Sequence, residues 1–165
     1  KLKLKEEYIK NKDLIPARLI WPIEQAPKIL AISENGKIGI LKWEFAGQKP
    51  GKINNLLPAG LENEKIINFI PLPNKKNISI GLISTDGKFK RISMDEFFDM
   101  SNRATTILKL KDNIKLKAGF ICEENGYIFI ISNIGRMLKF KITKKDMPYM
   151  GKLAQGPNMM KLFPD

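Results

Sequence analysis

The chain has 165 residues, 43% of them hydrophobic, and 29 Lys and Arg stand against 17 Asp and Glu, a net charge of +12. It has no histidine and one cysteine, which argues against a histidine-based triad, an ordinary zinc site or an internal disulfide framework. No apolar run approaches the ~20 residues of a membrane span, and no segment resembles a signal peptide, so a cytoplasmic protein with no membrane partner is expected.

The excess of bases over acids favours a polyanionic partner, because a net field of this size attracts phosphate-bearing ligands. The abundance of Lys, Ile and Asn is typical of an AT-rich genome, which explains Lys in place of Arg but not the excess of bases. The chain begins with Lys1 and not Met, so a fragment of a longer protein is expected.

Residues 1–12 include the alternating run KLKLK, which predicts the closing strand of a preceding unit. After them the sequence repeats. The three corresponding stretches are LIPARLIW with KILAISENGK, KIINFIPL with ISIGLISTDGK, and IKLKAGFI with YIFIISNIGR. In each, a glycine follows 23 residues after an acidic residue that opens the stretch. This spacing predicts three packed units, about 13–63, 64–111 and 112–165.

The same order of elements is predicted within each unit. An aliphatic strand leads, and a second strand runs into a glycine turn at Asn35-Gly36, Asp86-Gly87 or Ile134-Gly135. For the Asn-Gly and Asp-Gly pairs, a type I′ turn is expected. A third strand carries the cations (KIGILKW, KFKRIS, RMLKFKI), and a fourth is predicted in INNLLP, TTILKL and NMMKLF. Four short antiparallel strands per unit of about 50 residues predict an all-β, propeller-like fold.

Little helix is expected, because ten prolines are spread between the predicted strands. MDEFFDM (94–100) has room for one helical turn and is expected to be a turn at the edge of a blade. Cys122 lies in an apolar run, so it is expected to be a small buried hydrophobic residue.

Three ordered copies of this pattern resemble the C-terminal domain of the A subunit of the bacterial type IIA topoisomerases, DNA gyrase and topoisomerase IV. The most specific stretch is 131–162, with Gly135-Arg136, Met147-Pro148, Gly151 and Ala154-Gln155-Gly156. STDGKFKRIS (84–93) is the second match. The resemblance implies a β-pinwheel of about three to four four-stranded blades, part of a larger ring, in one domain over residues 1–165.

Gyrases of this family carry a Gln-Arg-Arg-Gly-Gly-Lys-Gly box, which tight chiral DNA wrapping requires. The nearest candidate here is Gln48-Lys49-Pro50-Gly51-Lys52, in which one glycine is missing and a proline replaces a basic residue. The resemblance therefore leaves gyrase and topoisomerase IV as alternatives.

The resemblance implies sequence-independent binding and wrapping of double-stranded DNA, which guides DNA for ATP-dependent strand passage and control of supercoiling. No catalytic residue, metal site or cofactor is expected in this domain. ATP and Mg would be bound elsewhere in the full enzyme, and the implied partners are the rest of the A subunit and the ATPase B subunit, in a nucleoid-associated location. Candidate phosphate contacts are Lys37, Lys42, Lys49, Lys52, Lys88, Lys90, Arg91, Arg103, Arg136, Lys139, Lys141, Lys144, Lys145 and Lys152.

Two alternatives remain open. A protein-binding propeller could dock an acidic partner on the same basic face. A propeller enzyme such as a glycosidase would need convergent carboxylates, and the acids Glu123-Glu124 and Asp95-Glu96 fall on predicted turns instead.

Overall fold

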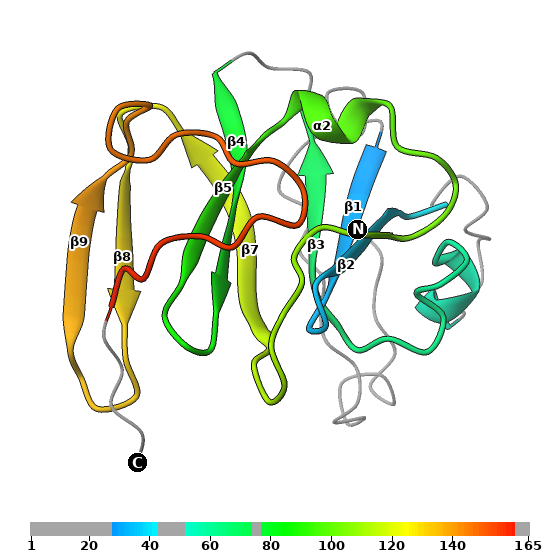
Figure 1. The fold of residues 1–165 in the computed structure, drawn as a ribbon. Helices are drawn as coiled ribbons and strands as arrows, with labels where there is room; N and C mark the ends of the chain where they lie inside the picture. Colours follow the sequence, from blue (N-terminus) through cyan, green and yellow to red (C-terminus); the bar gives the residue numbers. More distant parts are fainter. Residues whose placement is uncertain (1–27, 43–51, 74–76, 161–165) are drawn as a thin grey trace, which may run out of the picture.

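A computed structural model describes residues 28–42, 52–73 and 77–160 of the chain. These residues form almost only strands and connecting loops, arranged as three antiparallel sheets side by side (Figure 1). This confirms the predicted all-β fold. Among the described residues no helix is long and apolar enough to cross a membrane.

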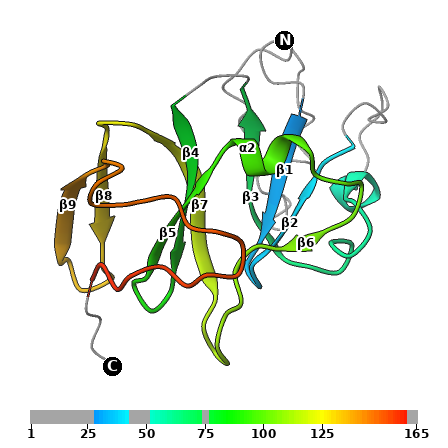
Figure 2. The ribbon, with the colours of Figure 1, turned by 45° about the horizontal axis from the view of Figure 1, so that its top comes forward.

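The first sheet has four strands in the order β3-β1-β2-β6. Its elements are β1 (Lys28–Ser33), β2 (Lys37–Ile40), β3 (Ile66–Leu72) and β6 (Thr105–Thr106). Figure 2 shows the short β6 beside β2, where Lys37 faces Thr106 and Ile38 faces Thr105.

The second sheet contains β5 (Phe89–Ser93), β4 (Ile78–Ser84) and β7 (Leu116–Glu123), in that order. The third is a hairpin of β8 (Tyr127–Ile131) and β9 (Met137–Lys141). Sheets of three and two strands differ from the predicted four per unit. In the second sheet, the place of a fourth strand is taken by one antiparallel bridge between Lys88 and Asn158.

Neighbouring units exchange strands. β3 leads the second predicted unit but pairs with β1 of the first, and β7 leads the third but pairs with β4 of the second. Both pairings carry a register shift at the same place, between Ile32 and Ser33 and between Ile83 and Ser84. The leading strands of the second and third units therefore complete the sheets of the units before them.

The glycine turns are built alike in all three units, but they are not the predicted type I′ turns. In each, the glycine N–H donates to the carbonyl of a serine three residues earlier, at Ser33, Ser84 and Ser132. At Asn35-Gly36 and Asp86-Gly87 only the glycine has positive φ, +78° and +80°. A type I′ turn would need positive φ at both central residues, whereas a glycine in this conformation after the turn produces a local bulge.

One predicted strand is replaced by helix. INNLLP contains the 3-10 helix η3 (Ile53–Leu56), in which Leu57 N–H donates to the Asn54 carbonyl at 3.2 Å. Asn54 and Asn55 favour turns over strands, and Pro58 offers no N–H to a ladder, which explains the difference. MDEFFDM, expected as a turn at the edge of a blade, forms the single helical turn α2 (Asp95–Phe98), with Phe97 buried.

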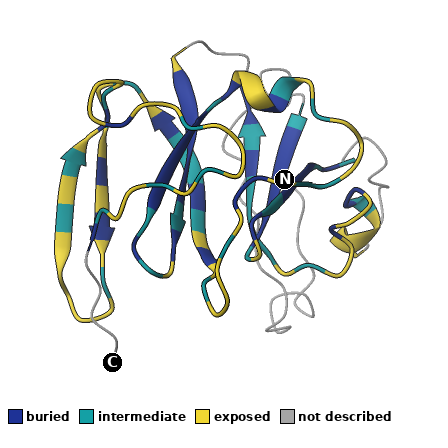
Figure 3. Ribbon diagram, in the orientation of Figure 1, coloured by how far each residue is buried: buried dark blue, intermediate teal, exposed yellow. Residues whose placement is uncertain are grey.

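The buried apolar residues form three clusters (Figure 3). The first lies between the first and second sheets, the second lies between the second and third sheets, and the third joins the first sheet to residues 56–61. Gly119 of β7 lies so close to Ile32 of β1 that an added Cβ would be 2.4 Å from its Cδ1 atom. Cys122 is 2% exposed, which confirms its predicted burial. The exchanged strand β7 is therefore packed against the first unit as well as paired with the second.

Candidate nucleic-acid interface

The cation after each turn glycine occupies an equivalent position in the three units. Lys37 and Arg136 each donate their N–H to the hydroxyl of the turn serine, Ser33 at 3.1 Å and Ser132 at 3.0 Å. Lys37 and Lys88 also hold matching ladder positions, opposite Thr106 and Asn158. The serine-to-glycine turn thus fixes where the chain places each of these three cations.

Lys37 and Lys88 each have an acidic partner. Lys37 Nζ lies 2.8 Å from Glu64 Oε1, and its hydrogen bond to that carboxylate lowers the pKa of Glu64. Lys88 Nζ lies 3.3 Å from Asp86 Oδ2 and 3.0 Å from Gln155 Oε1. Burial raises the pKa of Asp86, but hydrogen bonds from Ser84 and Lys88 outweigh it, and the net change is downward. Each of these two lysines therefore has a negatively charged carboxylate beside it.

Lys90 and Arg91 are not surface residues, contrary to the prediction that they contact DNA. Each is 1% exposed. Lys90 Nζ donates to the Ile107 carbonyl at 2.8 Å, and burial lowers its pKa to about 8. Both faces of β5 are covered, because the segment 147–157 crosses over the strand that pairs with β4 (Figure 1). Neither side chain can reach a phosphate while this packing holds.

Arg91 is the centre of a polar cluster that joins two units. Its Nε donates to Ser79 Oγ at 2.7 Å, and its Nη1 donates to the Met147 carbonyl at 3.2 Å. Its Nη2 forms an ion pair with Glu124, which lowers the pKa of that carboxyl, and its guanidinium lies 4.7 Å from the Tyr149 ring centroid. A buried charge is tolerated only where it is paired and hydrogen-bonded, as the Arg91 guanidinium is here. Arg91 therefore has a structural role.

The other predicted cations lie at or near the surface. Lys42 is partly buried, and the exposed members are Lys52, Arg103, Arg136, Lys139, Lys141, Lys144, Lys145 and Lys152. Most of these lie in the third unit, on β9 and in the loop that follows it. Lys152 pairs with Glu96 at 3.5 Å, and Lys139 Nζ lies 4.5 Å from the Tyr127 ring centroid. The box candidate, Gln48 to Gly51 with Lys49, lies outside the described residues, and only its last member, Lys52, is described.

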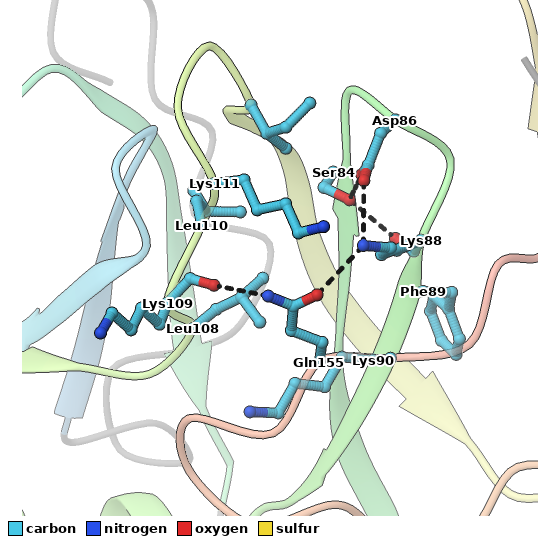
Figure 4. Close-up of a pocket in the computed structure, with 12 residues that line it drawn as sticks. Ser84, Asp86, Lys88, Phe89, Lys90, Leu108, Lys109, Leu110, Lys111 and Gln155 are labelled. Atoms are coloured by element: carbon cyan, nitrogen blue, oxygen red, sulfur yellow. Dashed lines mark hydrogen bonds and ion pairs between the residues drawn. The ribbon is translucent and has the colours of Figure 1, made fainter.

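Sequence reasoning missed a further group of exposed lysines between the second and third units. These are Lys109, Lys111, Lys115 and Lys117. The alternation of Lys with aliphatic residues in ILKLKDNIKLK was the available signal. Lys109 and Lys111 line a small hollow with Lys88 and Gln155, in which the Gln155 amide donates to the Lys109 carbonyl at 3.3 Å (Figure 4).

That hollow holds only about 10 Å³ of free space, far below the ~300 Å³ or more of a small-molecule site. In the described ranges, no group of three or more His, Cys, Asp or Glu side chains is placed to bind a metal ion. The exposed lysines and arginines of the described residues give the surface many separate positions at which an anion can bind.

No protein-family model and no curated protein matches this chain. Solved structures do match. The C-terminal domain of DNA topoisomerase IV has a TM-score of 0.65 at 20% identity, and the match covers 82% of this chain and 43% of that one. The DNA gyrase A C-terminal domain has a TM-score of 0.67 at 19% identity, covering 81% and 43%. The E. coli ParC C-terminal domain has a TM-score of 0.65 at 12% identity, covering 82% and 54%.

The chain thus spans about half the length of the structures it resembles. Its exchanged antiparallel strands and repeated turns agree with that likeness. The chain has the β-pinwheel fold of the C-terminal domains of gyrase A and topoisomerase IV.

Proposed function

We propose that this chain binds duplex DNA without reading its sequence, as the DNA-wrapping domain of a type IIA topoisomerase A subunit. The observation that carries the proposal is a net charge of +12 on this fold, with many lysines exposed on loops and strands. Strand passage, ATP hydrolysis and Mg binding belong in this proposal to other parts of the enzyme, including a B subunit.

The exposed cations of the third unit supply the main contact surface in this proposal. Arg136 lies just before β9, Lys141 ends it, and Lys144 and Lys145 lie in the loop after it, where flexible side chains can reach phosphates. Lys109 and Lys111 extend the basic surface toward the second unit. Contacts of this kind position a duplex but carry no sequence information. Bending 20–30 base pairs smoothly costs on the order of 1–6 kcal/mol, which several phosphate contacts can offset.

The proposal is tested by measuring the affinity for a random-sequence duplex of about 40 base pairs over a series of salt concentrations. Each phosphate contact contributes a slope of about −0.9 in log affinity against log salt. Lys141→Gln and Lys145→Gln should each reduce the slope by about that amount, and the double variant by about twice as much.

Lys65→Gln is the charge-matched control, because Lys65 is exposed, pairs with Glu34 at 3.1 Å and is outside the proposed contact set. It should leave the slope unchanged. Equal effects of the control and the two test variants would mean that only net charge matters. Failure to bind DNA at low salt, together with retention of an acidic protein, would overturn the proposal in favour of a protein-binding propeller.

A further inference from the structure

An exposed apolar side chain lies in a tight turn of the segment that covers β5. Residues 151–154 form this turn, in which the Ala154 N–H donates to the Gly151 carbonyl at 3.3 Å. Leu153 is its third residue, with φ +69°. Turns with positive φ at the third position favour glycine or asparagine there, because the left-handed conformation brings the Cβ of other residues too close to the following carbonyl oxygen. The backbone of Leu153 is therefore strained.

Elsewhere in the described residues, positive φ is found at residue types that tolerate it. Apart from glycines, the other residues in this conformation are Asn77, Asn113 and Asn125. Leu153 is also 55% exposed, so packing of its side chain offsets little of the strain. Strain that local packing does not explain is typical of functional positions. The leucine at this turn therefore calls for a functional explanation.

The backbone of the turn is held in place by hydrogen bonds to the preceding loop. Leu153 N–H donates to the Ile107 carbonyl at 3.2 Å. Two residues further on, the Gln155 side chain accepts from Lys88 Nζ at 3.0 Å and donates to the Lys109 carbonyl at 3.3 Å (Figure 4). A fixed backbone therefore presents the exposed leucine side chain to the surroundings.

Lysines lie close to this turn on both sides. Lys152 directly precedes the leucine, and its side chain is 39% exposed. Lys88, Lys109 and Lys111 line the hollow beside Gln155. Two of these four lysines have carboxylate partners, at 3.3 Å and 3.5 Å. An apolar side chain among cations suits a duplex, because the cations can hold phosphates while the apolar group contacts the bases.

We propose that Leu153 is a wedge that enters the minor groove of a bound duplex, inserts between two base pairs and kinks the DNA. This inference rests on the proposed function and extends it, because it supplies a way to bend the duplex. Leucine is among the apolar residues that act as such wedges, and the partial unstacking bends the duplex by about 20–90°. Pyrimidine–purine steps unstack most easily, so insertion is expected to favour TA and CA steps.

The test uses the full chain and a duplex of about 30 base pairs with a central TA step. A fluorescent adenine analogue at that step emits more strongly when it is unstacked, and a pair of dyes at the two ends reports bending by energy transfer. Wild-type protein should raise both signals. Leu153→Gly should abolish the rise in analogue emission and lower the energy transfer, because it has no side chain to insert. Leu153→Met retains a long apolar side chain and should keep both signals.

Two controls separate the wedge from a folding defect. Glycine suits positive φ, so the thermal unfolding midpoint of Leu153→Gly should lie above that of the wild type or within about 2 °C of it. Ile53→Ala removes a different exposed apolar side chain, on η3, and should leave both fluorescence signals unchanged.

The outcomes distinguish this inference from the proposed function. A wild type that does not bind the duplex at low salt would overturn both. Binding with the expected salt dependence but without a rise in analogue emission would overturn the wedge alone. The same conclusion would follow if Leu153→Gly raised the emission as much as the wild type does.

Discussion

Arg91 and Glu124 form an ion pair that links the second unit to the third. Arg91 lies on β5 and is 1% exposed, whereas Glu124 follows β7 and its side chain is 22% exposed. The same carboxylate also accepts the Lys144 N–H at 2.8 Å, which ties the loop after β9 to this junction. A residue that the sequence suggests as a DNA contact thus holds two units together.

Replacement of this arginine should destabilise the fold. Arg91→Met leaves the Met147 carbonyl without its guanidinium donor and removes a donor from Ser79 Oγ, and loss of such buried partners costs about 2–4 kcal/mol in total. Urea unfolding, followed by circular dichroism, measures the difference. Arg103→Met, at an exposed arginine, should stay within about 0.5 kcal/mol of the wild type. Equal stability of the two variants would contradict the structural role of Arg91.

The loop 151–156 should tolerate alanine at one glycine but not at the other. A Cβ on Gly156 would lie 1.8 Å from the Phe89 carbonyl oxygen, a backbone atom, whereas a Cβ on Gly151 would meet nothing within 4 Å. Gly156→Ala should therefore cost about 1–3 kcal/mol and displace the segment that pairs Asn158 with Lys88. Gly151→Ala is the matched control and should be near neutral. Amide exchange at Phe89, whose N–H donates to the Pro157 carbonyl, would reveal the displacement.

The buried Lys90 should make the free energy of unfolding increase with pH in the alkaline range. The folded-state pKa of Lys90 is lowered to about 8, below the value of 10.5 for an unperturbed lysine. Between these values the unfolded chain binds more protons than the folded one, so the folded state gains stability as the pH rises. The difference in unfolding free energy between the wild type and Lys90→Met should therefore rise from pH 8 to 10.5, by on the order of 2–3 kcal/mol. A flat difference over this range would show that Lys90 is not desolvated.

The single thiol should be inert in the folded protein. Burial raises the pKa of Cys122 to about 12, and its side chain is 2% exposed, so little thiolate forms and reagents cannot reach it. Labelling with a thiol reagent at pH 8 should be at least tenfold slower in native buffer than in 6 M guanidinium. Rapid labelling of the folded chain would mean that β7 opens locally at this position.

The local pattern predicts much of this fold. The repeated glycine turns, the leading segments at 66–72 and 116–123, the basic third strands and the turn at 94–100 all depend on side chains near each other in sequence. Turn chemistry and strand alternation are short-range properties, so one sequence suffices to predict them. The exception at Asn54-Asn55 follows the same principle, since two turn-forming residues before a proline outweigh the aliphatic residues around them.

What surrounds each strand is a property of the tertiary structure alone. Lys88, Lys90 and Arg91 look alike in the sequence, yet the segment 147–157 folds over β5 from more than fifty residues away and buries the last two. Exposure depends on which distant backbone covers a strand, and alternation within the strand carries no information about that cover. For the same reason, the run YIFII predicts a buried strand, but one edge and one face of β8 are exposed among the described residues. β1 is completed by β3 and β4 by β7, whereas β8 has no described counterpart of these strands.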